Sequence, residues 1–221
     1  MHVMPQGFVA CNDNGDRLAQ QQEFPRATMS TQDRRAKLRQ DLIHLAKGMI
    51  SEGGLDAVKA RPLAQQAGCS VGAIYNVFGD LKDLILAVNG ETFAALGAHV
   101  RASVPKGANP PDQLIAMSET YLDFAQKNPR LWRALFDVEM QTDGHVPDWY
   151  LAALDQLLAL IDHPVSAIYP ECSPDEIRLR TRTLFSAVHG IVLLGVERRI
   201  SAVQEDYLRD MIRFLLRQIV T

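Results

Sequence analysis

The apolar positions of the chain recur with the spacing of α-helices from Thr31 onward. In the first segment they fall at i, i+4, i+7, i+8, i+11 and i+12, which places them on one face of a helix. These positions are Leu38, Leu42, Leu45, Ala46, Met49 and Ile50. Gly53 and Gly54 follow and end the segment. No stretch of strand length alternates apolar and polar residues, so the pattern predicts an all-α fold with about nine helices.

Proline, glycine and capping residues mark the ends of the later helices. Asn128-Pro129 combines an N-cap with proline at the first helical position, and Ser173-Pro174-Asp175-Glu176 is a capping box that contains proline. Asp162-His163-Pro164 is expected to end a helix, because proline removes a backbone donor. These signals predict helices over about 80–105, 112–127, 129–141, 147–162, 173–199 and 203–220.

The segment 63–84, LAQQAGCSVGAIYNVFGDLKDL, predicts two short helices joined by a tight turn. After the first helix, Gly68 supplies a sharp exit that only a residue without a Cβ adopts cheaply. Ser70 is a good N-cap for the second helix, Val71 to Asn76, whose outward positions are small or polar. Such a helix can press its N-terminal end against base edges in a DNA groove. The pair therefore predicts a helix-turn-helix.

The formal net charge of −3 is unevenly distributed along the chain. Residues 30–79 hold seven Lys or Arg against four Asp or Glu, which gives +3. Residues 80–221 hold fourteen against nineteen, which gives −5. The basic excess thus coincides with the helix-turn-helix, where DNA phosphates would be met, and the acidic remainder suits a domain with a different role.

The order A-G-x-S-x-G-x-x-Y-x-x-F, from Ala67 to Phe78, resembles the DNA-binding domain of the TetR family of bacterial transcriptional regulators. The resemblance extends over about residues 34–90. A shorter segment, Leu184 to Gly190, is similar to the W-H-G-type signature in the C-terminal domain of one branch of that family, with Phe185 in place of tryptophan. The resemblance implies a disordered arm at 1–30, a helix-turn-helix DNA-binding domain at 31–79, and a ligand-binding and dimerisation domain at 80–221.

Three positions depart from the family pattern. Lys59 stands where a threonine usually caps the first short helix, and a lysine can reach a phosphate only as a point charge. Val77 stands where a second aromatic residue or histidine often follows Tyr75. Leu81, with Lys82 beside it, stands where a lysine commonly opens the fourth helix. We therefore expect the set of phosphate contacts to be partly rebuilt.

The candidate DNA contacts are basic, small or hydrogen-bonding residues around the two short helices. The Tyr75 hydroxyl is expected to contact a phosphate, and Asn76 either ends its helix or binds adenine or the backbone. Ala73 could meet a thymine methyl group. Arg34 and Arg35 belong either to a solvated charge run or to a contact with flanking phosphates or the minor groove. The full set is Arg34, Arg35, Lys59, Arg61, Ser70, Val71, Gly72, Ala73, Tyr75, Asn76 and Lys82.

Aromatic and soft residues of the second domain are the candidates for an effector site. Most are expected in the core, but some should line a cavity if the domain senses a ligand, since such pockets are apolar with a few polar groups. His189, next to Gly190, is the expected polar member, and a core histidine is the alternative we favour for it. The candidates are Tyr121, Phe124, Trp132, Phe136, Met140, Trp149, Phe185 and His189.

The last two helices carry broad apolar faces. They can bury these faces against a second copy as a four-helix bundle, or cover their own domain. A homodimer is favoured because a palindromic operator needs two recognition helices. The faces consist of Leu184, Val188, Ile191, Val192 and Gly195, then Tyr207, Leu208, Met211, Leu215 and Ile219.

Composition narrows the class of function. No apolar run approaches the ~18–20 uncharged residues of a membrane span, and no signal peptide is expected. Cys11, Cys69 and Cys172 are scattered and lack zinc spacing, which indicates reduced thiols in a cytoplasm and neither metal nor cofactor. Neither a nucleophile elbow, a phosphate-binding glycine loop nor a His-Glu-x-x-His motif is present, so no catalytic residue is predicted.

Together these features predict a cytoplasmic regulator that binds double-stranded DNA. By resemblance it is a repressor released from a palindromic operator by an unidentified small-molecule effector. Two alternatives stay open at this point. The first is a DNA-binding regulator controlled by protein partners without a small molecule, and the second is a helical enzyme.

Overall fold

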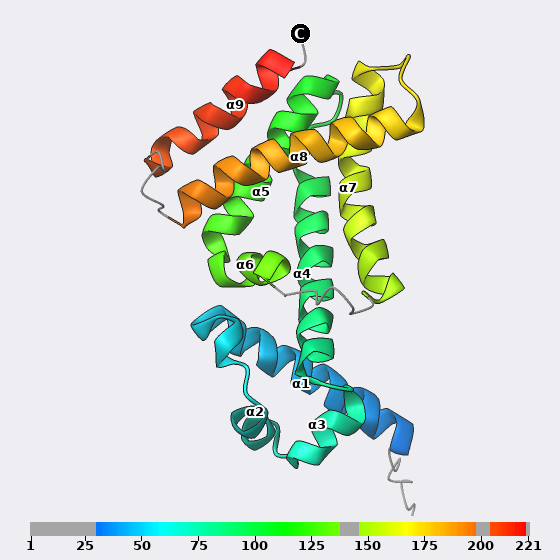
Figure 1. Ribbon diagram of the computed structural model, residues 1–221, viewed down its shortest axis with the longest axis vertical. Coiled ribbons are helices and arrows are strands. Elements are labelled where there is room, and N and C mark those ends of the chain that lie inside the picture. The colour runs from blue at the N-terminus through cyan, green and yellow to red at the C-terminus, as the bar shows by residue number, and fades with distance from the viewer. Residues whose placement is uncertain (1–29, 138–145, 198–203, 220–221) are drawn as a thin grey trace, which may run out of the picture.

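The computed structural model describes residues 30–137, 146–197 and 204–219. These residues form nine α-helices and two short 3-10 turns, with no strand among them (Figure 1). The all-α prediction is confirmed. The expected arm at 1–30, except Ser30, lies outside the described residues. The helices are α1 (Thr31–Gly53), α2 (Ala60–Ala67), α3 (Val71–Val77), α4 (Leu81–Ser103), α5 (Pro110–Lys127), α6 (Pro129–Asp137), α7 (Asp148–Ile168), α8 (Pro174–Val196) and α9 (Leu208–Ile219).

Apolar side chains gather in two cores, one at each end of the long helix α4 (Figure 1). The first core joins α1, α2, α3 and the beginning of α4, and Leu42, Leu63 and Ile74 are fully buried in it. The second core joins the remainder of α4 to α5, α7, α8 and α9. Since α4 contributes to both, it connects the small N-terminal unit rigidly to the larger C-terminal bundle.

Local signals set the geometry of the helix-turn-helix as predicted. Gly68 has φ 63° and ψ 33°, the left-handed conformation that glycine adopts without strain. The Ser70 hydroxyl accepts a hydrogen bond from the Ala73 N–H at 3.2 Å and caps α3. Gly54, with φ 76°, ends α1. These contacts orient α2 and α3 on α1.

Two predicted helix boundaries are wrong. Helix α7 does not end at Asp162-His163-Pro164 but continues through Pro164 to Ile168. Leu158 and Val165 are buried on either side of the proline, so packing against the bundle outweighs the lost backbone hydrogen bond. Helix α9 begins at Leu208 rather than Val203, where the buried spacing i, i+4, i+8 begins. The expected ends of α6 at 141 and of α8 at 199 lie outside the described residues.

Helices α7 and α8 are long and apolar enough to cross a membrane by length and composition alone. This corrects the expectation that no segment approaches a membrane span, which considered only uncharged runs. Each of these helices carries charged side chains, and the two pack against each other and against α5. Core helices of a bundle meet the same length and composition test.

The close packing of α8 on α9 depends on Gly195. A Cβ at this position would lie 2.5 Å from both Cδ atoms of Leu208, which is buried. We therefore expect Gly195→Ala to lower the free energy of unfolding by about 1–3 kcal/mol, measured by urea denaturation. Gly48→Ala is the control, because a Cβ there meets nothing within 4 Å and alanine favours the helix by up to about 1 kcal/mol. A Gly195→Ala protein as stable as the parent would contradict this packing.

Candidate functional site

Helix α3 presents a small polar surface outward. Ile74 is fully buried and anchors the helix in the first core, whereas Gly72, Tyr75 and Asn76 are exposed. The Tyr75 side chain is 44% exposed, which is unusual for so large a ring in a small domain. The structure thus leaves the predicted recognition residues accessible without opening the core.

Other predicted DNA contacts differ in how accessible they are. Val71, Ala73 and Lys82 are half-buried. Ser70 is exposed, but its hydroxyl is used in capping α3. Lys59 precedes α2 and makes no side-chain cap, as the departure from the family pattern implies. The fully exposed basic members are Arg34, Arg35, Lys59 and Arg61.

The basic run at the start of α1 makes contacts within the protein. The Arg35 guanidinium donates a hydrogen bond to the Asn76 carbonyl at 2.8 Å and so ties α1 to the end of α3. The Arg39 guanidinium lies over the Phe78 ring, 5.1 Å from its centroid. Lys37 pairs with Asp41 on the same helix. These side chains hold α3 in place, a role that the sequence could not indicate because the partners lie about 40 residues away.

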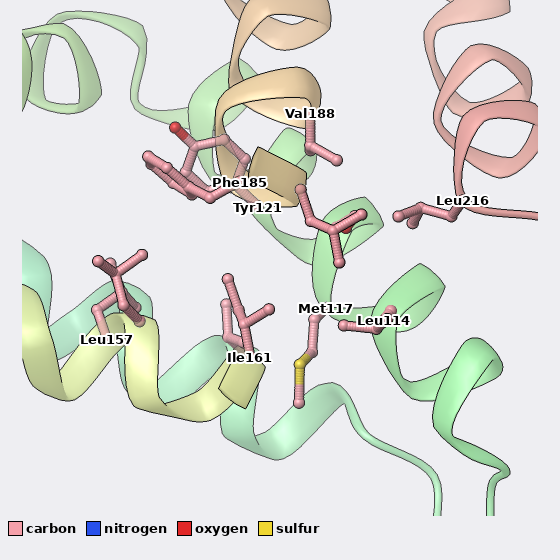
Figure 2. A pocket seen from close by; sticks show the side chains of 12 residues that line it. Leu114, Met117, Tyr121, Leu157, Ile161, Phe185, Val188 and Leu216 are labelled. Carbon is pink, nitrogen blue, oxygen red and sulfur yellow. The ribbon is translucent and has the colours of Figure 1, made fainter. Parts of the chain in front are cut away.

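The second core contains a small cavity of about 50 Å³ enclosed by α4, α5, α7, α8 and α9 (Figure 2). In Figure 2, Leu157 and Ile161 on α7 point toward Phe185 and Val188 on α8. Its lining is apolar except for Ser118 and Tyr121, and it includes no charged side chain. The lining consists of Val100, Leu114, Met117, Ser118, Tyr121, Leu157, Leu158, Ile161, Leu184, Phe185, Val188 and Leu216.

Tyr121 and His189 form a hydrogen-bonded pair beside the cavity. The Tyr121 hydroxyl lies 2.7 Å from His189 Nδ1, and the His189 ring stacks on Phe185 with centroids 5.6 Å apart. Burial lowers the pKa of His189 and raises the pKa of the Tyr121 hydroxyl. Both groups are therefore neutral at pH 7, and the hydroxyl can donate to the imidazole nitrogen. Trp132 and Phe136 complete the cluster around the imidazole.

The structure brings together part of the predicted effector set. Tyr121 and Phe185 line the cavity, and Trp132, Phe136 and His189 surround this polar pair. Phe124 instead packs against His99, and Trp149 packs against Gly90 and Tyr150 at the start of α7. These two do not belong to the cavity, and Met140 lies outside the described residues. The aliphatic lining was missed, because its spacing cannot be distinguished from that of ordinary core residues.

Helix α6 contributes to both cores. Leu131 and Ala134 pack in the first core, while Trp132 and Leu135 pack in the second. The buried amide of Asn89 on α4 donates a hydrogen bond to the Ala134 carbonyl at 2.8 Å. Arg130 donates to the Ser51 carbonyl at the end of α1, at 3.2 Å. Helix α6 therefore connects the aromatic cluster mechanically to the helix-turn-helix.

The apolar faces expected to form a dimer mostly cover their own domain. Leu184, Val188, Val192 and Leu208 are buried within the chain, because α5 and α9 pack over them. The exposed apolar residues of α8 and of the segment that leads into and forms α9 are others, namely Leu179, Leu194, Tyr207 and Phe214. Within the described ranges, no group of three or more His, Cys, Asp or Glu side chains is arranged to hold a metal ion.

An exposed recognition helix on a helix-turn-helix, joined to a helical domain with an apolar cavity, defines a two-domain DNA-binding regulator. Two family models match the chain, "Bacterial regulatory proteins, tetR family" over residues 42–88 and "Tetracyclin repressor-like, C-terminal domain" over residues 114–219. The chain belongs to the TetR family. Regulators of this family bind operator DNA and small-molecule ligands and dimerise, and they are not enzymes.

Individual relatives agree with this assignment. The chain is 26% identical over 180 residues to the HTH-type transcriptional repressor KstR of Mycobacterium tuberculosis, covering 80% of each chain. A Rhodococcus sp. RHA1 protein of unknown function has the same fold, with a TM-score of 0.67, 20% identity, and coverage of 89% of this chain and 98% of that one. The regulator FadR of Bacillus subtilis, solved with stearoyl-CoA, has a TM-score of 0.63, 17% identity, and coverage of 80% and 96%.

The burial of His189 predicts a pH dependence of stability. Its pKa is lowered in the folded protein, so the unfolded chain binds the proton more tightly and stability falls as the pH drops below about 6.5. We expect the free energy of unfolding to decrease from about pH 7 to pH 5, and to decrease less in His189→Gln. His163→Gln is the control for loss of an exposed histidine. Equal pH profiles for the parent and His189→Gln would contradict the assignment.

Proposed function

We propose that this protein is a cytoplasmic repressor that binds a palindromic operator as a homodimer and leaves it when a small molecule occupies the cavity. The observation that carries the proposal is the position of α6, which packs in both cores. A change at the cavity would reach the helix-turn-helix through this helix.

In the DNA-bound form, α3 lies in the major groove. Gly72 and Ala73 at its N-terminal part are small enough for close approach to base edges. Tyr75 and Asn76 follow on the exposed side, where a hydroxyl and an amide can bond to phosphates and bases. Arg61 and Lys59 add positive charge near the backbone. In a dimer, the two α3 helices enter successive grooves about 34–36 Å apart or somewhat more.

Effector binding acts through the aromatic cluster. A ligand that enlarges the cavity at Tyr121 displaces the neighbouring Trp132 ring, whose centroid lies 6.0 Å from that of Tyr121. Because Trp132 and Ala134 lie on one short helix, displacement is transmitted to the first core and to α1. Only a ligand that binds the displaced form more tightly drives release. A regulator that responds to protein partners alone needs no such cavity, so the cavity favours the small molecule.

The dimer forms through the outer surface of α8 and the segment 207–214. Phe214 and Leu179 are 69% and 68% exposed, values that are costly for such side chains in a monomer. A second copy related by a two-fold axis would bury the same residues on both partners.

Removal of the Tyr75 hydroxyl tests the recognition surface. We first select the operator from a random DNA library and expect a palindromic motif. A hydrogen bond to a charged phosphate is worth about 1.5–3 kcal/mol, so Tyr75→Phe is expected to raise the Kd for this operator at least tenfold. The readout is fluorescence anisotropy, and Tyr169→Phe in the second domain is the control. Unchanged affinity would exclude the phosphate contact, and no enriched motif would exclude sequence-specific recognition.

A charge on the outer surface of α9 tests the dimer. Phe214→Asp is expected to convert a dimer into a monomer in sedimentation-velocity experiments, because burying an unpaired carboxylate at an apolar interface is strongly unfavourable. Leu151→Asp, at an exposed leucine on α7, is the matched control and is expected to remain dimeric. If both variants sediment as the parent does, the dimer uses another surface.

A further inference from the structure

A surface groove lies next to the internal cavity and shares a residue with it. The groove follows the seam between α4 and α7 and has a volume of about 210 Å³. Leu157 lines both the groove and the cavity. The groove is lined by Gly90, Phe93, Ala94, Gly97, Arg101, Ala153, Gln156, Leu157 and Leu160. Leu157 is therefore placed between the solvent and the cavity.

The Leu157 side chain can act as a gate. It is half-buried, and leucine side chains that are partly exposed change rotamer rapidly. Across the seam stands Gly97, where an added Cβ would lie 3.7 Å from Leu157 Cδ1. Glycine thus leaves free space beside the leucine on the α4 side. A rotation of one side chain joins the groove to the cavity, with no movement of backbone.

The volumes favour a ligand that uses both spaces. Sites for small molecules commonly measure about 300–1,000 Å³. The cavity of about 50 Å³ is too small by itself, and the groove of about 210 Å³ is shallower than a typical site. Together they form a narrow, elongated space that suits a thin chain rather than a compact ring system.

The charges along this path differ between its two ends. The cavity is lined without any charged side chain, so a charged group cannot be buried there at acceptable cost. Arg101 is exposed and is the one charged residue among those that line the groove. A guanidinium binds carboxylates and phosphates through paired hydrogen bonds. An anionic group would thus remain at the surface while an apolar chain goes inward.

We propose that the α4–α7 groove admits the effector, that Leu157 is its gate, and that the effector is a single-chain amphiphile. Its apolar tail lies in the cavity beside Tyr121, and its anionic head, a carboxylate or a phosphate, pairs with Arg101. The inference rests on the proposed function in that this cavity is taken as the effector site. It adds the chemical class of the effector and the way in.

The head-group contact is tested with four probes of matched structure: decanoate, decyl phosphate, decanol and butyrate. Binding to the full-length protein is measured by calorimetry, without DNA. Decanoate or decyl phosphate is expected to bind more tightly than decanol, and the preferred one identifies the head. Butyrate is expected not to bind. Arg101→Gln should weaken binding of the preferred anion about three- to tenfold and leave decanol unchanged, and added salt should weaken the parent in the same way.

Arg178→Gln, at an exposed arginine on α8 outside the groove, is the matched control. It is expected to bind all four probes as the parent does. Equal binding of the anions by the parent and Arg101→Gln would overturn the head-group site. Absence of saturable binding of both ten-carbon anions would overturn the amphiphile as effector class.

The gate is tested by filling the space around Leu157. Gly97→Ala places a methyl group in ordinary contact with Leu157 and is expected to fold, since the 3.7 Å distance needs no rearrangement. It should slow the association of the preferred anion several-fold in stopped-flow measurements of tryptophan fluorescence. Leu157→Trp should block binding of that anion, with circular dichroism as the check on folding. Unchanged association rates in Gly97→Ala would overturn the gate.

A last measurement separates this inference from the proposed function. The selected operator, labelled for anisotropy, is bound to the protein and titrated with the preferred anion. If the anion binds through Arg101 but the operator stays bound, effector-driven release is wrong and the amphiphile site stands. If another molecule releases the operator and the ten-carbon anions do not bind, release stands and this inference is overturned.

Discussion

The packing of α6 against both cores is the constraint on which the arrangement of this protein depends. Leu131 and Ala134 are buried with the helix-turn-helix, and Trp132 and Leu135 are buried with the bundle that holds the cavity. Since cores are close-packed, a short helix shared by two of them cannot move in one without disturbing the other. The hydrogen bond from Asn89 to Ala134 adds a directional contact to α4, the helix that joins the two units.

The chemistry at the other end of this connection is neutral. Tyr121 and His189 satisfy each other's hydrogen-bonding groups within a cluster of aromatic rings, and burial keeps both uncharged at pH 7. A neutral pair in an apolar setting can exchange its mutual hydrogen bond for one to a ligand at modest cost, whereas a buried ion pair could not. The position of the only charge along the path, Arg101 in the groove lining, then separates the polar and apolar ends of whatever binds.

At the opposite end, the recognition helix is held by residues that do not themselves face outward. Ile74 fixes α3 in the core, Ser70 caps it, and Arg35 binds its last turn through the Asn76 carbonyl. This support leaves Gly72 and Tyr75 accessible. Part of the basic run on α1 therefore serves to position α3, which agrees with the partly rebuilt set of phosphate contacts in this chain.

The sequence by itself determined the elements whose causes are local. Gly68, Ser70 and the Ser173–Glu176 capping box act on residues within four positions, so the helix class, most helix boundaries and the helix-turn-helix were predictable. Only the tertiary structure decided what depends on packing: that α7 continues through Pro164, that the faces of α8 and α9 turn inward, and that Leu157, rather than Trp149 or Phe124, lines the cavity. The physical reason is that an apolar residue carries the same periodic signal in a core, a cavity wall or an interface, and its neighbours in space distinguish these environments.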